Sequence, residues 1–270
     1  MWYTVPNKDF LRKRGGEMPE KMGQKPETDV LSGRNAVSEA LKSGRVIDHI
    51  EVARGERTGS IVALVAKAKE RGIPVKEVDS RKLDFLAGKN HQGIAAVAAC
   101  KAFSSLADVF ALAAERGEPP FLVVCDELED PHNLGAVIRT AECAGAHGVI
   151  IPKRHSAGLT SAVYKASAGA VEYMPVVRVT NIADTVNELK EKNVWVFGLD
   201  MDGQSWDKTD LSGAVALVIG SEGHGISRLV RERCDGIVSL PMVGHVNSLN
   251  ASVAGGILMY EVLRRRQNGT

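Results

Sequence analysis

The sequence has few aromatic residues and lacks the long apolar runs of a membrane protein. Aromatic residues occupy 5% of the 270 positions. No apolar run approaches the roughly 20 residues needed to cross a bilayer. Residues 1–16 also lack the apolar core of a secretory signal. We therefore expect no membrane span and a location in the cytoplasm.

Closely spaced cysteines are also missing. The four cysteines, Cys100, Cys125, Cys143 and Cys234, include no C-x-x-C pair. Structural zinc sites and disulfide frameworks need closer or more regular spacing. We therefore expect no metal site, and we expect the four thiols to be reduced, buried members of the core.

Neither sign of charge is in excess. The chain carries 34 basic and 33 acidic residues, for a formal net charge of +1. Such a balance produces no global field that would attract a polyanion. It does not exclude nucleic acid, because a local basic patch is enough to contact phosphates.

The length and patterning indicate two domains of α/β class. A chain of 270 residues exceeds the usual single-domain size. Residues 1–28 are polar and predict a flexible extension, whereas 29–100 alternate between helix and strand patterns. Residues 101–119 predict a helical linker that ends before Pro119 and Pro120. In residues 120–270, apolar runs alternate with helical stretches, which indicates a parallel sheet covered by helices on both faces. The expected strands of this second domain are 121–125, 148–151, 194–199, 214–220 and 236–240.

Polar residues cluster after three of these expected strands, where open α/β sheets form their ligand crevice. The first cluster, 126–141, places Asn133 at an expected helix start and Arg139 six residues later. A guanidinium at this edge can grip a phosphate with two hydrogen bonds. Asn133 would equally serve as a plain helix cap, and Arg139 as half of a surface salt bridge.

The second and third clusters are a glycine-rich turn and the approach to the last helix. Gly220, Gly223 and Gly225 follow an apolar strand and permit close backbone approach to a ligand, although a tight connection alone would also explain them. Glu222 at the centre of this turn needs a partner. In the third cluster, 240–254, Ser248 and Asn250 can cap the final helix. Neither a P-loop nor a dinucleotide fingerprint is present.

Taken in order, the three clusters resemble the motifs of the SpoU (TrmH-like) family of RNA ribose 2′-O-methyltransferases, within the SPOUT superfamily. The matching strings are D-P-x-N-x-G-x-x-x-R-T-A, I-G-S-E-G-x-G and L-P-M-x-G-x-x-x-S-L-N-x-S. The segments 31–37 and 91–94 resemble the L30e-like RNA-binding domain attached to many members. The layout is most similar to the bacterial enzymes that methylate a guanosine ribose in 23S rRNA.

The resemblance implies a trefoil-knotted catalytic domain, S-adenosylmethionine as methyl donor, RNA as substrate, and a homodimer whose active site is completed at the interface. No metal is needed. It implies that backbone at Gly220, Leu240 and Leu249 holds the cofactor. The functional side chains that it implies are Asn133, Arg139, Glu222, Ser248 and Asn250.

Arg139 is the proton acceptor proposed in this family, but an arginine side chain stays protonated at neutral pH. We favour a role in which Arg139 binds a phosphate and stabilises the developing alkoxide, oriented by Glu222 and Asn133. Ser248 and Asn250 would orient the ribose or the loop. Any of the histidines near the motifs would offer another base.

Three alternatives remain open at this point. The same chemistry would act on tRNA, or on another rRNA nucleotide such as an adenosine whose methylation blocks an antibiotic. A non-catalytic RNA-binding protein of ribosome assembly would use the front domain but leave Arg139, Glu222 and Asn250 unexplained. A nucleotide-dependent oxidoreductase would lack its expected fingerprint.

Overall fold

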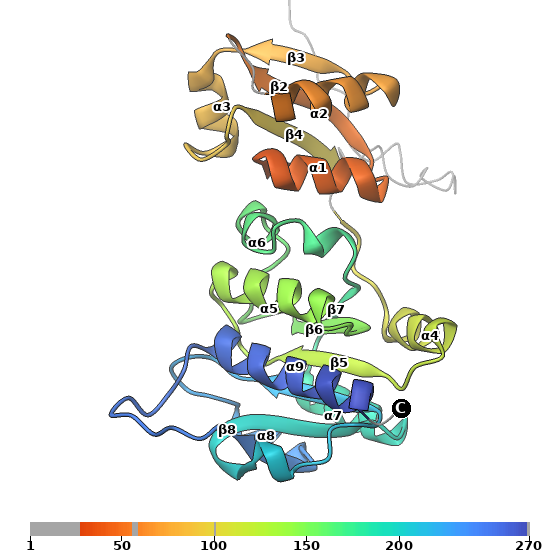
Figure 1. Ribbon diagram of the computed structural model, residues 1–270, viewed down its shortest axis with the longest axis vertical. Helices are drawn as coiled ribbons and strands as arrows, with labels where there is room; N and C mark the ends of the chain where they lie inside the picture. The colour runs from red at the N-terminus through yellow and green to blue at the C-terminus, as the bar shows by residue number, and fades with distance from the viewer. Residues whose placement is uncertain (1–27, 56–58, 100, 269–270) are drawn as a thin grey trace, which may run out of the picture.

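A computed structural model describes residues 28–55, 59–99 and 101–268. Figure 1 shows two sheets with their helices, one above the other, joined by a segment that runs down one side past helix α4. The expected extension, 1–28, lies outside the described residues except for Thr28, which begins the first strand.

The N-terminal sheet is mixed and has four strands in the order β1-β4-β2-β3. Strands β2 and β3 are parallel, whereas β4 runs antiparallel to both β1 and β2. Helix α1 buries Ala36, Val37, Ala40 and Leu41, at the spacing of one helical face. The elements are β1 (Thr28–Ser32), α1 (Arg34–Ser43), β2 (Ile47–Ala53), α2 (Gly59–Glu70), β3 (Val75–Val78), α3 (Ser80–Ala87) and β4 (Ile94–Ala99).

The C-terminal sheet has six parallel strands in the order β10-β8-β9-β5-β6-β7, which confirms the predicted α/β class and parallel sheet. Its strands are β5 (Phe121–Cys125), β6 (Gly148–Pro152), β7 (Val176–Val179), β8 (Trp195–Ser205), β9 (Val215–Ile219) and β10 (Gly236–Ser239). The helices are α4 (Leu106–Arg116), α5 (Pro131–Cys143), α6 (Ser161–Ala166), α7 (Ile182–Glu191), α8 (Arg228–Arg233) and α9 (Ala251–Asn268), with short 3₁₀ turns η2 (Ala170–Glu172) and η3 (Trp206–Lys208).

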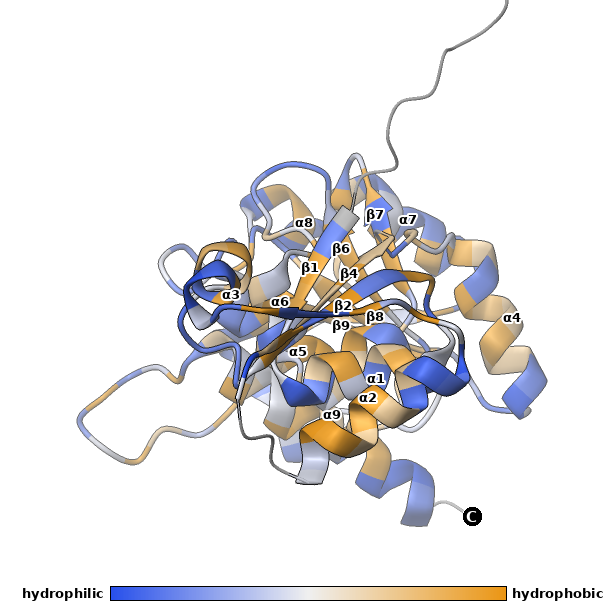
Figure 2. Ribbon diagram, turned by 90° about the horizontal axis from the view of Figure 1, so that it is seen from above, coloured by the Kyte–Doolittle hydropathy of each residue, from blue (hydrophilic) through white to orange (hydrophobic). Residues whose placement is uncertain are grey.

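Burial on both faces explains why the central strands are continuous apolar runs. Every residue of β5 and β9 is buried. Along β5, Phe121 and Val123 belong to one hydrophobic cluster, whereas Leu122 and Val124 belong to a second one. Alternate residues of a strand point to opposite faces, so each cluster fills one side of the sheet. Figure 2 shows hydrophobic residues on both strands and helices, and hydrophilic ones at the outer ends of α4 and α9.

The strand order reverses direction beside β5. This strand has β6 on one side and β9 on the other, so the loops that leave β5 and β9 diverge at their carboxyl ends. Open parallel sheets bind ligands at such a point. The first two polar clusters follow β5 and β9, which flank this point, and the third follows the edge strand β10.

The two sheets are joined by polar contacts between α1 and the segment around η2. Tyr173 donates to Glu39 at 2.7 Å, and Arg45 forms an ion pair with Glu172 at 2.7 Å. Lys101 donates to the carbonyl oxygens of Val171 and Met174. Hydrogen bonds and an ion pair therefore connect the N-terminal sheet to the segment of the C-terminal half that leads into β7.

The cysteine prediction holds for one residue and fails for another. Cys125 is fully buried in β5, and this burial raises the pKa of its thiol to about 12. Cys143 is exposed at the end of α5, so its description as a core residue was wrong. It lies on the outer face of a helix whose inner face packs on the sheet. Cys234 is half-buried, and Cys100 lies outside the described residues.

Among the residues that the structure describes, no helix is long and apolar enough to cross a membrane. No group of three or more His, Cys, Asp or Glu side chains among them is placed to hold a metal ion.

His147, at the start of β6, is a buried titratable group in the core. Its Nδ1 accepts a hydrogen bond from the backbone of Phe121 at 3.0 Å, and its Nε2 lies 3.2 Å from Glu118. Burial lowers the pKa of this imidazole, and Arg116 and Arg266 add to the effect against the attraction of Glu118. The neutral form is therefore the one that the fold favours.

Acidification below about pH 6.5 is expected to destabilise the protein through His147. Between the lowered pKa of folded His147 and its ordinary value, the unfolded chain binds a proton that the folded chain does not. The free energy of unfolding is therefore highest above the ordinary value. As the pH falls below that value, it decreases by up to about 1.4 kcal/mol per pH unit. Urea unfolding at pH 7.5, 6.5 and 5.5 measures this slope. His147→Gln should flatten it, whereas a matched change at the exposed His155 should not; equal slopes in both variants would contradict the assignment.

Candidate active site

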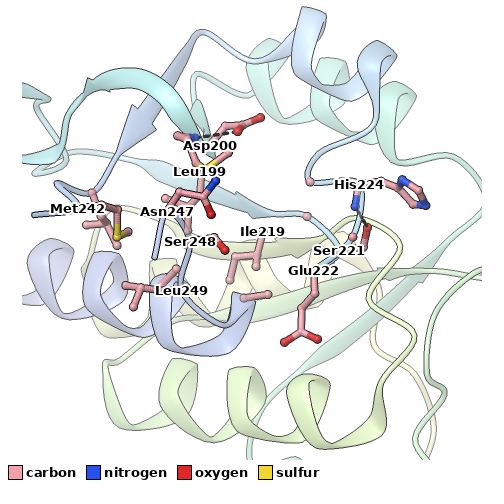
Figure 3. A pocket seen from close by; sticks show the side chains of 17 residues that line it. Leu199, Asp200, Ile219, Ser221, Glu222, His224, Met242, Asn247, Ser248 and Leu249 are labelled. Carbon is pink, nitrogen blue, oxygen red and sulfur yellow. Dashed lines mark hydrogen bonds between the residues drawn. The ribbon is translucent and has the colours of Figure 1, made fainter. Parts of the chain in front are cut away.

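The second and third polar clusters line one cavity of about 330 Å³ at the carboxyl edge of the C-terminal sheet, and the first cluster lines a second hollow beside it. The walls of the cavity come from the ends of β8 and β9 and from the loop between β10 and α9 (Figure 3). Gly220, Leu240 and Leu249, the expected cofactor-binding residues, all line it. The remaining lining residues are Leu199, Asp200, Met201, Ile219, Ser221, Glu222, Gly223, His224, Gly225, Met242, Asn247, Ser248, Ala251 and Ala254.

The glycine-rich turn folds back on itself at the cavity wall. The backbones of Ser221 and Gly225 exchange hydrogen bonds of 3.0 and 2.9 Å, and Gly225 adopts a φ of 65°. A Cβ on Gly220 would lie 2.1 Å from the carbonyl carbon of Gly225. Glycine is therefore required at 220 to close the turn, which brings bare backbone to the cavity.

The loop 241–250 carries the third cluster and is exposed at every position. In Figure 1 it reaches out, in blue, beyond the start of α9. Asn250 Oδ1 accepts from the backbone of Ser252 at 3.0 Å and of Val253 at 3.3 Å, so this side chain caps α9 as the sequence predicts. Ser248 lines the cavity instead.

Asn250 also joins Asn133 and Glu222. Its Nδ2 donates to Asn133 Oδ1 at 2.9 Å and, by a second hydrogen bond, to Glu222 Oε1. Asn133 is buried, 6% exposed, and lies inside α5. The cap of α5 is Asp130, which accepts from the backbone of His132 at 3.0 Å, so the interpretation of Asn133 as a plain cap was wrong.

This asparagine–glutamate group lies between two hollows. The second hollow, of about 360 Å³, is lined by residues 127–130, Asn133 and residues 221–224. Glu222 borders both. The arrangement suits a site with a cofactor on one side and a substrate on the other, with the polar group at the boundary.

Arg139 lies apart from this group. It is exposed on α5, six residues and roughly 9 Å of helix rise beyond Asn133, on a different face. With the residues that the structure describes, it forms neither a hydrogen bond nor an ion pair. The surface salt bridge considered from the sequence is thus absent from this part of the chain, and neither Glu222 nor Asn133 forms a hydrogen bond or ion pair with Arg139.

Sequence reasoning missed the contribution of β8. Leu199, Asp200 and Met201 line the cavity, and Asp200 is held by Arg231 of α8. The sequence offered one signal, which is that the apolar run of this strand ends at Leu199 and a polar segment follows it at the carboxyl edge of the sheet.

The cavity fits S-adenosylmethionine. A volume of about 330 Å³ falls within the range of small-ligand sites. Ile219, Leu240 and Leu249 supply apolar walls for a flat base, and the turn at Gly220 exposes backbone at its edge. Asp200, Ser221, Glu222, His224, Asn247 and Ser248 add polar groups to these apolar walls, and such a mixture is usual in a cofactor site.

Comparison with known proteins agrees with this geometry. Residues 120–260 match the SpoU rRNA Methylase family, and residues 30–103 match the RNA 2′-O ribose methyltransferase substrate binding family. The chain belongs to the SpoU family. SpoU proteins are RNA ribose 2′-O-methyltransferases that use S-adenosylmethionine, and this enzyme class, predicted from the motifs, is confirmed.

Relatives of this SpoU protein match both halves of the chain. A Bacillus subtilis protein named as a TrmH family tRNA/rRNA methyltransferase is 48% identical over 239 residues, which is 88% of this chain and 96% of that protein. The SpoU methyltransferase AviRb of Streptomyces viridochromogenes, crystallised with AdoMet, gives a TM-score of 0.75 at 25% identity, over 90% of this chain and 92% of its own. An AdoMet-bound rRNA methyltransferase of Sinorhizobium meliloti gives 0.72 at 25% identity, over 88% and 87%.

Proposed function

We propose that this SpoU methyltransferase methylates the ribose 2′-hydroxyl of one guanosine in 23S rRNA. The observation that carries the proposal is the pairing of a substrate-binding domain with a catalytic domain in one chain, 30–103 and 120–260. Structures that match across both halves include one described as an rRNA methyltransferase. Such an enzyme would act in the cytoplasm, on the ribosome or its precursors.

In the proposed site, the bound cofactor supplies a methyl group on a positively charged sulfur, which is already a strong electrophile. The protein therefore has mainly to align the 2′-oxygen and stabilise the charge that develops on it. Backbone at Gly220, Leu240 and Leu249 would hold the cofactor. Asn250, fixed by Asn133 and Glu222, would set the boundary that the ribose meets.

Ser248 extends the same boundary. It lines the cavity two residues before Asn250, on the exposed loop that leads into α9. Its hydroxyl can donate one hydrogen bond and accept two, which suits contact with the ribose or with the cofactor. We assign it an orienting role.

The substrate is tested by methyl transfer from isotope-labelled S-adenosylmethionine to unmodified 23S rRNA and, in parallel, to unmodified tRNA. Mapping the alkali-resistant ribose then identifies the nucleotide. Label at one guanosine of 23S rRNA is the expected result. Label on tRNA, or on a different rRNA nucleotide, would replace the proposed substrate and leave the family assignment intact.

A homodimer would complete the site. Helix α9 exposes Val253, Ile257 and Tyr260, at spacings that form one stripe, and the described residues do not cover it. Helix α5 packs beside α9 and carries the exposed Arg139. A second copy that covers the stripe would bring Arg139 of one protomer toward the asparagine–glutamate group of its partner.

Ile257→Glu is expected to convert the dimer into a monomer and to lower methyl transfer by about a hundredfold, since a catalytic charge is lost with the partner. Sedimentation velocity measures the assembly state, and the labelled-cofactor assay measures the rate. Leu229→Glu, at a position on α8 that is 46% exposed against 38% for Ile257, is the matched control and should change neither. A wild-type protein that sediments as a monomer while active would contradict the proposal.

A further inference from the structure

Asp200 carries a carboxylate that lines the cofactor cavity but has no role in the proposed methyl transfer. It lies at the point where β8 leaves the sheet core, between Leu199 and Met201, and all three residues line the cavity. Figure 3 shows Asp200 on the opposite side of the cavity from Glu222. Because Glu222 accepts from Asn250, Asp200 is the acidic group left on the other wall.

The position of the Asp200 carboxylate is fixed by the protein. Its Oδ1 accepts from the backbone of Met201 at 2.7 Å. Its Oδ2 accepts from Arg231 of α8, and the same Oδ2 lies 3.7 Å from the place that a Cβ on Gly225 would occupy. The carboxylate is thus held beside the bare backbone of the glycine-rich turn.

Each oxygen of this carboxylate still has a lone pair to offer. A carboxylate oxygen accepts two hydrogen bonds, and here the protein supplies one to each. The bonds that remain would point to donors in the cavity. Arg231 already compensates the negative charge, so a cationic ligand group beside Asp200 would also meet the guanidinium. A neutral donor is therefore favoured over an ammonium.

We infer that Asp200, held by Arg231, hydrogen-bonds the ribose hydroxyls of S-adenosylmethionine. The vicinal hydroxyls are neutral donors whose spacing matches the two oxygens of a carboxylate, and an acidic side chain at the end of a strand is a known partner of a nucleotide ribose. Arg231 is a positioning residue in this arrangement. The inference rests on the proposed placement of the cofactor in this cavity.

The structure offers a matched control for Asp200. Asp202 forms an ion pair with the same Arg231 at 2.7 Å, but its side chain is 71% exposed and does not line the cavity. Asp202→Asn therefore removes one partner of the arginine without touching the ligand. Asp200→Asn removes an equivalent partner together with the proposed acceptor.

Calorimetric titration of the full-length protein with S-adenosylhomocysteine and with its 2′,3′-dideoxy analogue tests the inference. Asp200→Asn should weaken binding of S-adenosylhomocysteine by about tenfold, as expected for loss of a charge-assisted hydrogen bond. Asp202→Asn should leave it nearly unchanged. The analogue should bind the wild type about tenfold more weakly and should lose nothing further in Asp200→Asn, since the two changes remove the same contact.

The opposite outcomes are distinct. Equal effects of Asp200→Asn and Asp202→Asn would reduce Asp200 to a structural partner of Arg231 and overturn the inference. The same loss for both ligands in Asp200→Asn would also overturn it. If Asp200→Asn does not fold, the wild type alone tests the inference: equal affinities for S-adenosylhomocysteine and its 2′,3′-dideoxy analogue would overturn it. A wild type that binds neither ligand would instead contradict the cofactor placement itself.

Discussion

Replacement of Arg139 by alanine is expected to lower the rate of methyl transfer by about a hundredfold or more, with no change in the affinity for S-adenosylhomocysteine. Loss of one group that stabilises developing charge typically has this effect. The affinity should hold because Arg139 is exposed on α5 and does not line the cofactor cavity. Its removal also leaves no described partner unsatisfied, so the fold should be intact.

Lysine at the same position separates two roles of the cation. If Arg139 grips a phosphate with two parallel hydrogen bonds, Arg139→Lys should remain well below the wild-type rate, because an ammonium cannot reproduce the planar fork. Single-turnover assays on the mapped rRNA measure both variants, with Arg228→Ala on α8 as an exposed control. A lysine variant near the wild-type rate would contradict the bidentate grip.

Variants of the asparagine–glutamate group should behave differently from Arg139→Ala. Asn250 joins Glu222 and Asn133 and also caps α9. Its loss would disturb the loop that lines the cavity, so cofactor affinity and rate should fall together. The comparison distinguishes a residue that meets the substrate from residues that shape the site.

The sequence predicted the strands of the catalytic domain well where burial on both faces leaves a continuous apolar run. Strands β5 and β9 lie at the expected positions for this reason. Strand β7 was missed because it has only four residues, of which one is exposed, and so short a segment shows no clear alternation of apolar and polar residues. Residues 200–205 of β8 were missed as well, since this polar stretch is extended only through pairing with β10 across a register shift.

The site was predicted in part for a related reason. Asn133, Glu222 and Asn250 stand in motifs, and the parallel sheet brings their strands' ends together. Asp200 stands in no motif, and only the fold places it at the cavity. Arg139 was expected beside Glu222, but helical geometry turns it to another face of α5, where the described residues offer it no hydrogen-bond partner.

Contacts between the two domains could not be predicted from a single sequence. Arg45 makes several of the contacts that matter here. This residue follows α1, yet its guanidinium pairs with Glu172 across 127 positions of the chain. It also bonds Asp29 at 2.8 Å and the carbonyl oxygen of Ala99, and it lies over the ring of Tyr164 at 4.6 Å. The side chains of Arg45 and Glu172 are 6% and 4% exposed.

Arg45→Ala is expected to lower the free energy of unfolding by about 3 kcal/mol, because it leaves the buried carboxylate of Glu172 without its cation. Adding Glu172→Gln should recover part of this loss, since the uncompensated charge disappears. Urea unfolding measures both variants. Lys42→Ala, which breaks the exposed pair with Glu39, is the control and should cost at most about 0.5 kcal/mol.

The same substitution tests whether the domain contact serves catalysis. Arg45 is far in sequence from the motifs and lines neither hollow of the active site. If it fixes the substrate-binding domain against the catalytic domain, the double variant Arg45→Ala with Glu172→Gln should raise KM for RNA several-fold while kcat and the affinity for S-adenosylhomocysteine hold. A variant of lower stability with an unchanged KM would show that the contact supports the fold alone. A rise in KM for RNA with an unchanged kcat would indicate that RNA contacts both domains and that the ion pair holds them in position for binding.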